Sequence, residues 1–263
     1  MNGTVNDIAC CGATPLYLTA AFIIEEGLSV ADLQRIVKSM KEAADKAGVY
    51  IISGDTKVVE KGKCDKIFIN TTGIGIVDEN VNISPKNVVE GDVIICSGPI
   101  GIHGITILST RESLGFETDL KSDTASLNDV ITGLYTGIKD IHVLRDPTRG
   151  GISSALNEIA SVANVEIELD EALLPIPETV RSASEILGLD PLYIANEGVV
   201  LVILPAQHAD KALEIMRRYE EGKSAAIIGK VNKTDKPLVK MKSIYGGYKI
   251  VTMLNGDQLP RIC

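Results

Sequence analysis

The chain contains no tryptophan, and Phe, Tyr and Trp together make up only 4% of its 263 residues. Since 45% of the residues are nonetheless hydrophobic, we expect a globular protein whose core is mainly aliphatic. A chain of this length can bury a substantial core, and it is long enough for two domains of ordinary size.

Basic residues are outnumbered by acidic ones, 26 against 35, which gives a net charge of -9. Nucleic acids and anionic membrane surfaces bind proteins through basic patches that displace counterions. We therefore expect no nucleic-acid or membrane partner, although a magnesium nucleotide could still bind locally.

The sequence also lacks a basic segment followed by a long apolar run at its start, and no apolar stretch approaches the roughly 20 residues of a spanning helix. We therefore expect a cytoplasmic protein. Its five cysteines, Cys10, Cys11, Cys64, Cys96 and Cys263, are odd in number and form no CxxC pair. This pattern disfavours a disulfide framework and a structural zinc site.

The first third of the chain reads as helix, strand, helix, strand, strand. Ser29 is a suitable N-cap for a helix whose apolar residues recur at helical spacing, and Gly48 is a suitable end. The other expected elements are a helix over 3–11, a strand over 15–24, and two strands in VYIISGDTKVV and KIFINTTGIGIV, which are rich in β-branched residues.

A polar stretch with Pro85 and Gly91 is the expected domain boundary. It separates an N-terminal domain (1–85) from a C-terminal domain (86–254). The last residues (255–263) are expected to form a mobile tail, because they lack a packing period. In the second domain we expect strands in VIICSGPIG, HVLR and VVLVILP, and helices over 103–113, over 124–136, after DPTRGG, and in HADKALEIMRRYE.

These elements do not alternate regularly between strand and helix, so a doubly wound parallel sheet is not the favoured architecture. We predict an α+β fold with two domains, each a mixed sheet covered by helices on one face.

Asp55, Thr56 and Lys57 follow a glycine in the segment ISGDTKVV. An acid, a hydroxyl and an ammonium at a strand end could bind magnesium and phosphate, and Asp7, on a short helix, could also bind magnesium. A turn with solvated charges remains the alternative for the first group, and a capping role for Asp7.

DPTRGG, at 146–151, is expected to join a strand to a helix, where its glycines could bring backbone N–H groups to an anion with help from Arg149. A capped strand–helix turn explains the segment equally well. His103, in SGPIGIHG, is left unassigned because a structural role is more common.

Glu197 precedes a strongly apolar strand, where burial would raise its pKa and suit it to proton transfer; a solvated charge at the strand end is the alternative. Cys263 is the last residue, and an exposed terminal thiol is a nucleophile on a tether. Most terminal cysteines have no such role.

The segments GTVNDIA, PLYLTAAFIIEEG, SGDTKVVEKGK, FINTTGIG, SGPIGIHG, DPTRGG, IANEG and PRIC occur in this order over nearly the whole chain. Together they resemble the HypE family of hydrogenase maturation proteins, carbamoyl dehydratases with an aminoimidazole ribonucleotide synthetase-like fold. The terminal PRIC distinguishes this family from selenophosphate synthetase and thiamine monophosphate kinase, which lack that tail.

The resemblance implies ATP-dependent conversion of a thiocarboxamide on Cys263 to a thiocyanate, which supplies the cyanide ligands of nickel-iron hydrogenases. It implies that Glu197 and Lys57 remove protons, and that Asp7 and Asp55 hold Mg²⁺ and phosphates with help from Thr56. The implied partners are the carbamoyltransferase HypF, a HypC–HypD complex and a second copy of the chain.

Family members carry some tens of residues, with first strands and another acid, before GTVNDIA, so the resemblance implies an incomplete first domain. A non-catalytic docking or carrier form, and another ATP-dependent synthetase of the superfamily, are therefore the alternative functions.

Overall fold

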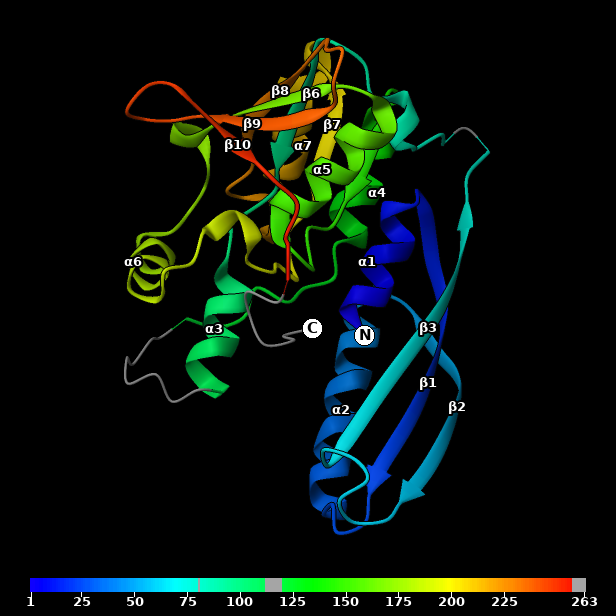
Figure 1. Cartoon of the computed structure of the whole chain (residues 1–263). Helices are drawn as coiled ribbons and strands as arrows, with labels where there is room; N and C mark the ends of the chain where they lie inside the picture. Colours follow the sequence, from blue (N-terminus) through cyan, green and yellow to red (C-terminus); the bar gives the residue numbers. More distant parts are fainter. Residues whose placement is uncertain (80, 112–119, 257–263) are drawn as a thin grey trace.

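The computed structural model describes residues 1–79, 81–111 and 120–256, so Cys263 and most of the expected tail lie outside the described residues. The chain forms two sheets (Figure 1). The first lies within residues 13–77 and the second within residues 92–251. No helix in the described ranges is long and apolar enough to cross a membrane.

The first sheet has the order β2-β1-β3 and is mixed, since β1 runs parallel to β2 and antiparallel to β3. Its elements follow the predicted order: α1 (Asn2–Cys10), β1 (Ala13–Glu25), α2 (Val30–Ala47), β2 (Tyr50–Val59) and β3 (Ile67–Val77). Ser29 caps α2 by accepting the N–H of Asp32 at 3.0 Å, and Gly48 ends it in the left-handed region at φ 67°.

Helices α1 and α2 cover one face of this sheet (Figure 1). Val5 of α1 and Ala44 of α2 pack with Leu18 of β1 in a small buried cluster. Gly73 lets α1 approach, since a Cβ there would lie 2.4 Å from the Ile8 side chain and 2.6 Å from that of Leu18. The opposite face carries exposed apolar residues, namely Tyr17, Ile23, Tyr50, Phe68, Ile74 and Ile76.

The second sheet has the order β10-β9-β6-β8-β4-β7-β5 and pairs its strands antiparallel except for β6 with β9. The strands are β4 (Asp92–Cys96), β5 (Val143–Arg145), β6 (Glu166–Asp170), β7 (Leu201–Pro205), β8 (Ala226–Asn232), β9 (Leu238–Lys242) and β10 (Tyr248–Val251).

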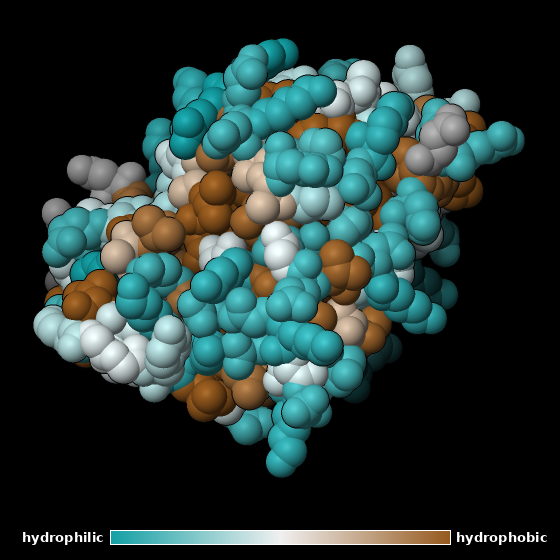
Figure 2. Space-filling model, turned by 90° about the horizontal axis from the view of Figure 1, so that it is seen from above, coloured by the Kyte–Doolittle hydropathy of each residue, from teal (hydrophilic) through white to brown (hydrophobic). Residues whose placement is uncertain are grey.

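The helices of this part are α3 (Ile102–Arg111), α4 (Asn128–Gly137), α5 (Gly151–Ala163), α6 (Glu178–Leu187) and α7 (Ala209–Met216). Short 3-10 turns occupy Pro85–Asn87, Glu171–Leu173, Pro191–Tyr193, Ala206–His208 and Glu220–Gly222. Seen from above, the molecule presents a largely hydrophilic surface with smaller groups of apolar residues between (Figure 2).

Both faces of the second sheet are covered, so the expectation of helices on one face is wrong for this part of the chain. Consecutive residues of β4 show the reason, because Ile94 packs in a core with α5 whereas Ile95 packs in another with α4 and α7. Side chains alternate between the faces of a strand, so a strand buried at every position needs cover on both sides.

Candidate functional site

Three of the motifs converge on the fully buried side chain of Asn196. Its amide nitrogen donates to the carbonyls of Pro147 and Ile194, both at 3.0 Å, and its Oδ1 accepts the N–H of Gly101 at 2.7 Å. These contacts bring together three segments that are far apart in sequence, DPTRGG, SGPIGIHG and IANEG. The resulting cluster of loops positions the next residue, Glu197.

Glu197 lies just before β7, as expected, and its pKa is raised to about 7. Burial is the main cause, because desolvation disfavours the charged form. The negative charges of Asp123, Asp146 and Asp7 raise the pKa further, while the amino group of Met1 lowers it. A carboxyl group with this pKa can accept or release a proton near neutral pH.

Asp123 lies beside Glu197 and accepts its backbone N–H, with distances of 3.2 and 3.3 Å to the two carboxylate oxygens. Burial raises the pKa of Asp123. His103, from α3, lies 3.9 Å from the same carboxylate and has its Nδ1 2.8 Å from the hydroxyl of Ser122.

Glu197 and the three acids that influence it, Asp123, Asp146 and Asp7, form an acid cluster. Asp7 and Asp146 both line a cavity of about 410 Å³ between α1, β5 and α5. Burial and the charge of Asp7 raise the pKa of Asp146. The volume is in the range of small-ligand pockets. Mg²⁺ is usually held by one or two carboxylates together with phosphate oxygens, so this pair of acids fits a magnesium phosphate group.

Asp55, Thr56 and Lys57 do not lie at a strand end, and they do not form a turn either, because β2 continues through them to Val59. Gly54 serves the strand pairing: a Cβ there would lie 2.7 Å from the carbonyl oxygen of Ala20. Asp55 and Lys57 pair with Ala21 and Ile23 and therefore share their exposed face of the sheet.

The predicted site residues therefore fall into two groups. Asp7 and Glu197 lie in the acid cluster, whereas Asp55 and Lys57 lie on the uncovered face of the first sheet. Among the described residues, no hydrogen bond or ion pair joins the two groups. Asp7 is carried by α1, which packs on the covered face of the first sheet, whereas Asp55 lies on the opposite face. The described residues contain no cluster of three or more potential metal ligands.

DPTRGG joins β5 to α5, as predicted. Its last two glycines both have positive φ, and a Cβ on Gly151 would lie 2.5 Å from the carbonyl oxygen of Leu192 and 2.7 Å from that of Ile194. Close backbone packing accounts for the glycines, so an anion site is not required to explain them.

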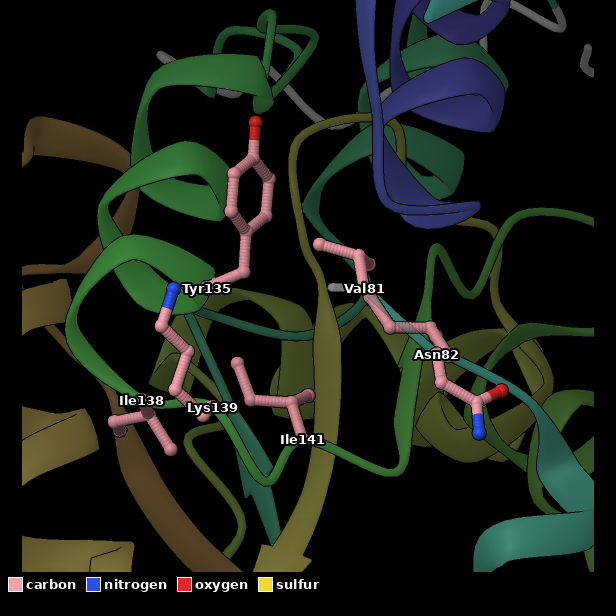
Figure 3. Close-up of a pocket in the computed structure, with 7 residues that line it drawn as sticks. Val81, Asn82, Tyr135, Ile138, Lys139 and Ile141 are labelled. Atoms are coloured by element: carbon pink, nitrogen blue, oxygen red, sulfur yellow. The ribbon is translucent and has the colours of Figure 1, made fainter. Parts of the chain in front are cut away.

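A separate, shallow pocket lies between α4 and the segment that links the two sheets (Figure 3). Val81, Asn82, Tyr135 and Ile141 are among the residues that line it, and its volume is about 10 Å³. Such a space holds about one water molecule, so it is not a substrate site.

Comparisons with known proteins identify the family and the fold of the chain. Models of the AIR synthase related proteins match the chain, the N-terminal domain over residues 1–77 and the C-terminal domain over residues 89–242. The carbamoyl dehydratase HypE of Azotobacter vinelandii is 50% identical over 263 residues, which is all of this chain and 77% of that protein.

The chain belongs to the HypE family. A crystal structure of the hydrogenase maturation protein HypE in complex with ATP has a TM-score of 0.96 and 48% identity, and the match covers all of this chain and 80% of that one. A HypE–HypF complex contains a chain matched with a TM-score of 0.93 and 53% identity, over 96% of this chain and 82% of that one. The predicted α+β, AIR synthase-like fold is confirmed.

Sequence reasoning missed three residues of this candidate site, Asn196, Asp123 and Asp146. Asn196 and Asp146 belong to the quoted motifs IANEG and DPTRGG, so both could have been proposed beside their neighbours. Asp123 lies in none of the quoted motifs, and its contact with Glu197 joins residues 74 apart. No local sequence pattern therefore predicts its role.

Proposed function

We propose that this protein is an ATP-dependent carbamoyl dehydratase of hydrogenase maturation that converts a thiocarboxamide on Cys263 to a thiocyanate. The observation that carries the proposal is Glu197, a partly buried carboxyl group with a pKa of about 7, in a chain of the HypE family. Relatives named carbamoyl dehydratase and a HypE structure with ATP support the chemistry.

The reaction needs a leaving group and a base. The thiocarboxamide oxygen leaves poorly as hydroxide, but it leaves readily as phosphate once the γ-phosphoryl group of ATP has been transferred to it. The nitrogen loses two protons in all as the carbon–nitrogen triple bond forms and the carbon–oxygen bond breaks. Glu197 accepts a proton from this nitrogen, and its partial burial keeps competing water away.

The roles of the other residues are also part of the proposal. Asp7 and Asp146, which line the same cavity, would bind Mg²⁺, and the ion would neutralise the phosphate charge of ATP. Asp55 and Lys57 would meet a nucleotide or a substrate only at the exposed face of the first sheet, whereas Thr56, which pairs with Phe22, lies on its other face. Lys57 would act as a base there only if other positive charges or burial lowered its pKa.

The proposed partners follow from the same family. HypF would load Cys263, which a HypE–HypF structure supports, and a HypC–HypD complex would accept the product. A second copy of the chain would cover the exposed apolar face of the first sheet. The protein would work in the cytoplasm.

The test separates loading from dehydration. The chain is incubated with HypF and a labelled carbamoyl donor, and mass spectrometry then follows its C-terminal peptide before and after addition of ATP and Mg²⁺. Cys263→Ala should prevent loading. Glu197→Gln should load normally but dehydrate about 10²- to 10⁴-fold more slowly, the usual contribution of a general base.

Glu214→Gln is the matched control, because Glu214 is an exposed residue of α7 that pairs with Arg218; it should leave both steps unchanged. Normal dehydration by Glu197→Gln would remove that residue from the mechanism. A wild-type chain that is loaded but never dehydrated with ATP would contradict the enzymatic proposal and favour a carrier role.

A further inference from the structure

We propose that Asp123 is a positioning residue for Glu197: its carboxylate holds the backbone N–H of Glu197 and so fixes where that side chain enters the acid cluster. The inference rests on the proposed function of Glu197. It concerns a residue outside the motifs, on a segment that leads from α3 to α4.

The contact between the two segments is held at several points. Besides the two distances from the Asp123 carboxylate to the Glu197 nitrogen, 3.2 and 3.3 Å, the N–H of Ala125 donates to the carbonyl oxygen of Glu197 at 3.4 Å. The next residue, Gly198, has no room for a side chain, because a Cβ would lie 1.8 Å from the carbonyl oxygen of Asp123.

Helix α1 closes this contact from the other side through Asn6. Its amide nitrogen donates to the carbonyls of Ala125 at 3.0 Å and Glu197 at 3.4 Å, and its Oδ1 accepts the N–H of Leu127 at 2.8 Å. The backbone of Glu197 is thus fixed both by Asp123 and by the helix that carries Asp7. A side chain that starts from a backbone fixed in this way enters the acid cluster from one position, which favours proton transfer.

The Asp123 carboxylate has a second effect because it is a charge as well as an acceptor. The charged groups that influence Glu197 are Asp123, Asp146, Asp7 and the amino group of Met1, and Asp123 contributes the largest of these charge effects. His103 faces Asp123 from α3 and lowers the pKa of Asp123, against the larger effect of burial. Replacement of the carboxylate by an amide would keep an acceptor and remove the charge.

The experiment compares Asp123→Ala, Asp123→Asn and the control Asp129→Asn, an exposed acid at the start of α4. ATP-dependent dehydration is measured against pH on loaded chains. In parallel, NMR of protein labelled with ¹³C at glutamate carboxyls follows Glu197 directly, with its resonance assigned from Glu197→Gln.

We expect Asp123→Ala to lower kcat about 10²-fold, the scale of a small misplacement of a catalytic group, with little change in KM for ATP. Asp123→Asn should recover most of kcat, and the pH midpoint of Glu197 should fall below its value of about 7 in both measurements. Asp129→Asn should match the wild type.

Two results would overturn the inference: wild-type kcat in Asp123→Ala, or an Asp123→Asn variant in which the Glu197 titration is unmoved. Failure of the proposed function would look different. In that case Glu197→Gln would dehydrate normally, while the NMR titration of Glu197 would still report whether Asp123 controls it.

Discussion

The two sheets differ in how many of their faces are covered. The second sheet is packed on both sides, by α5 on one and by α4 and α7 on the other. The first is covered by α1 and α2 on one side only, and its other side exposes a row of large apolar residues. The second sheet therefore has a complete core of its own, whereas the first lacks cover for half of its surface.

The acid cluster lies between these unequal parts. Helix α1 connects them, because Ala9 and Cys10 belong to the core under α4 and α7 while Val5 belongs to that of the first sheet. Large exposed apolar patches are uncommon on monomeric proteins and often mark an interface. The comparison supports the proposal that a second copy of the chain covers the exposed face of the first sheet.

The largest effect should come from a matched pair of isoleucines. Ile167 of β6 is fully buried, whereas Ile76 of β3 is 64% exposed. Ile167→Ala should lower the free energy of unfolding by about 2–5 kcal/mol, because it leaves a cavity. Ile76→Ala should change it by less than about 0.5 kcal/mol in a chain that is not associated with a second copy. Urea denaturation of both variants provides the measurement, and equal losses would show that the first sheet is covered in solution.

A charge on the exposed face should show what covers it. Ile74→Lys places an ammonium among Tyr17 and Ile76 on the uncovered side of the sheet. If two copies associate through this face, their dissociation constant should rise at least about tenfold, since burying an unpaired charge is costly. Sedimentation velocity over a concentration series measures it. Lys38→Ala, on the exposed side of α2, is the control and should leave association unchanged.

The sequence predicted the first part of the chain better than the second, for physical reasons. Helix α2 was predicted at both ends because capping by Ser29 and Gly48 is local. The covering of both faces of the second sheet was missed, although the unbroken apolar run of β7 indicates it. The contact of Asp123 with Glu197 could not be predicted, since it depends on tertiary packing of segments remote in sequence.

The domain boundary remains a prediction, and so do the roles of Asp55, Thr56 and Lys57. Their segment was expected to be a strand end because glycine often interrupts strands. In the structure Gly54 allows two backbones to approach, and β2 runs on. A single glycine cannot distinguish these two cases from sequence.

Stability should depend on pH through Glu197 in the direction opposite to that of an ordinary paired acid. Its folded pKa of about 7 lies above the usual 4.5, so the folded chain binds more protons between these values. The contribution of protonated Glu197 to folding stability is fully present below pH 4.5 and is lost as the pH rises through 7. The wild type should lose on the order of 1 kcal/mol of its free energy of unfolding over this pH range, a figure reduced for partial exposure, and Glu197→Gln should not show this loss. Thermal melts from pH 4.5 to 8 test it, and parallel curves for the two proteins would contradict it.

The smallest effects should separate surface ion pairs on the two parts of the chain. Lys240 of β9 lies 2.9 Å from Glu166 and 3.1 Å from Glu168, and its ammonium lies 4.5 Å from the centre of the Tyr248 ring. Lys41 of α2 pairs with Asp45 at 2.6 Å. The Lys240 side chain is 21% exposed and that of Lys41 73%, so water screens the second pair more strongly.

Lysine-to-methionine variants keep most of the aliphatic side chain and remove the charge at either position. Lys240→Met should cost about 0.5–1 kcal/mol and Lys41→Met about 0.3 kcal/mol, measured by urea denaturation at low salt. The hydrogen bond from Lys240 lowers the pKa of Glu166, so this stabilisation is lost as the pH falls below the usual range of a glutamate. Lys240→Met should therefore approach the wild type in stability at acidic pH. Equal losses at the two positions would show that the network on the second sheet is no stronger than a single exposed pair on the first.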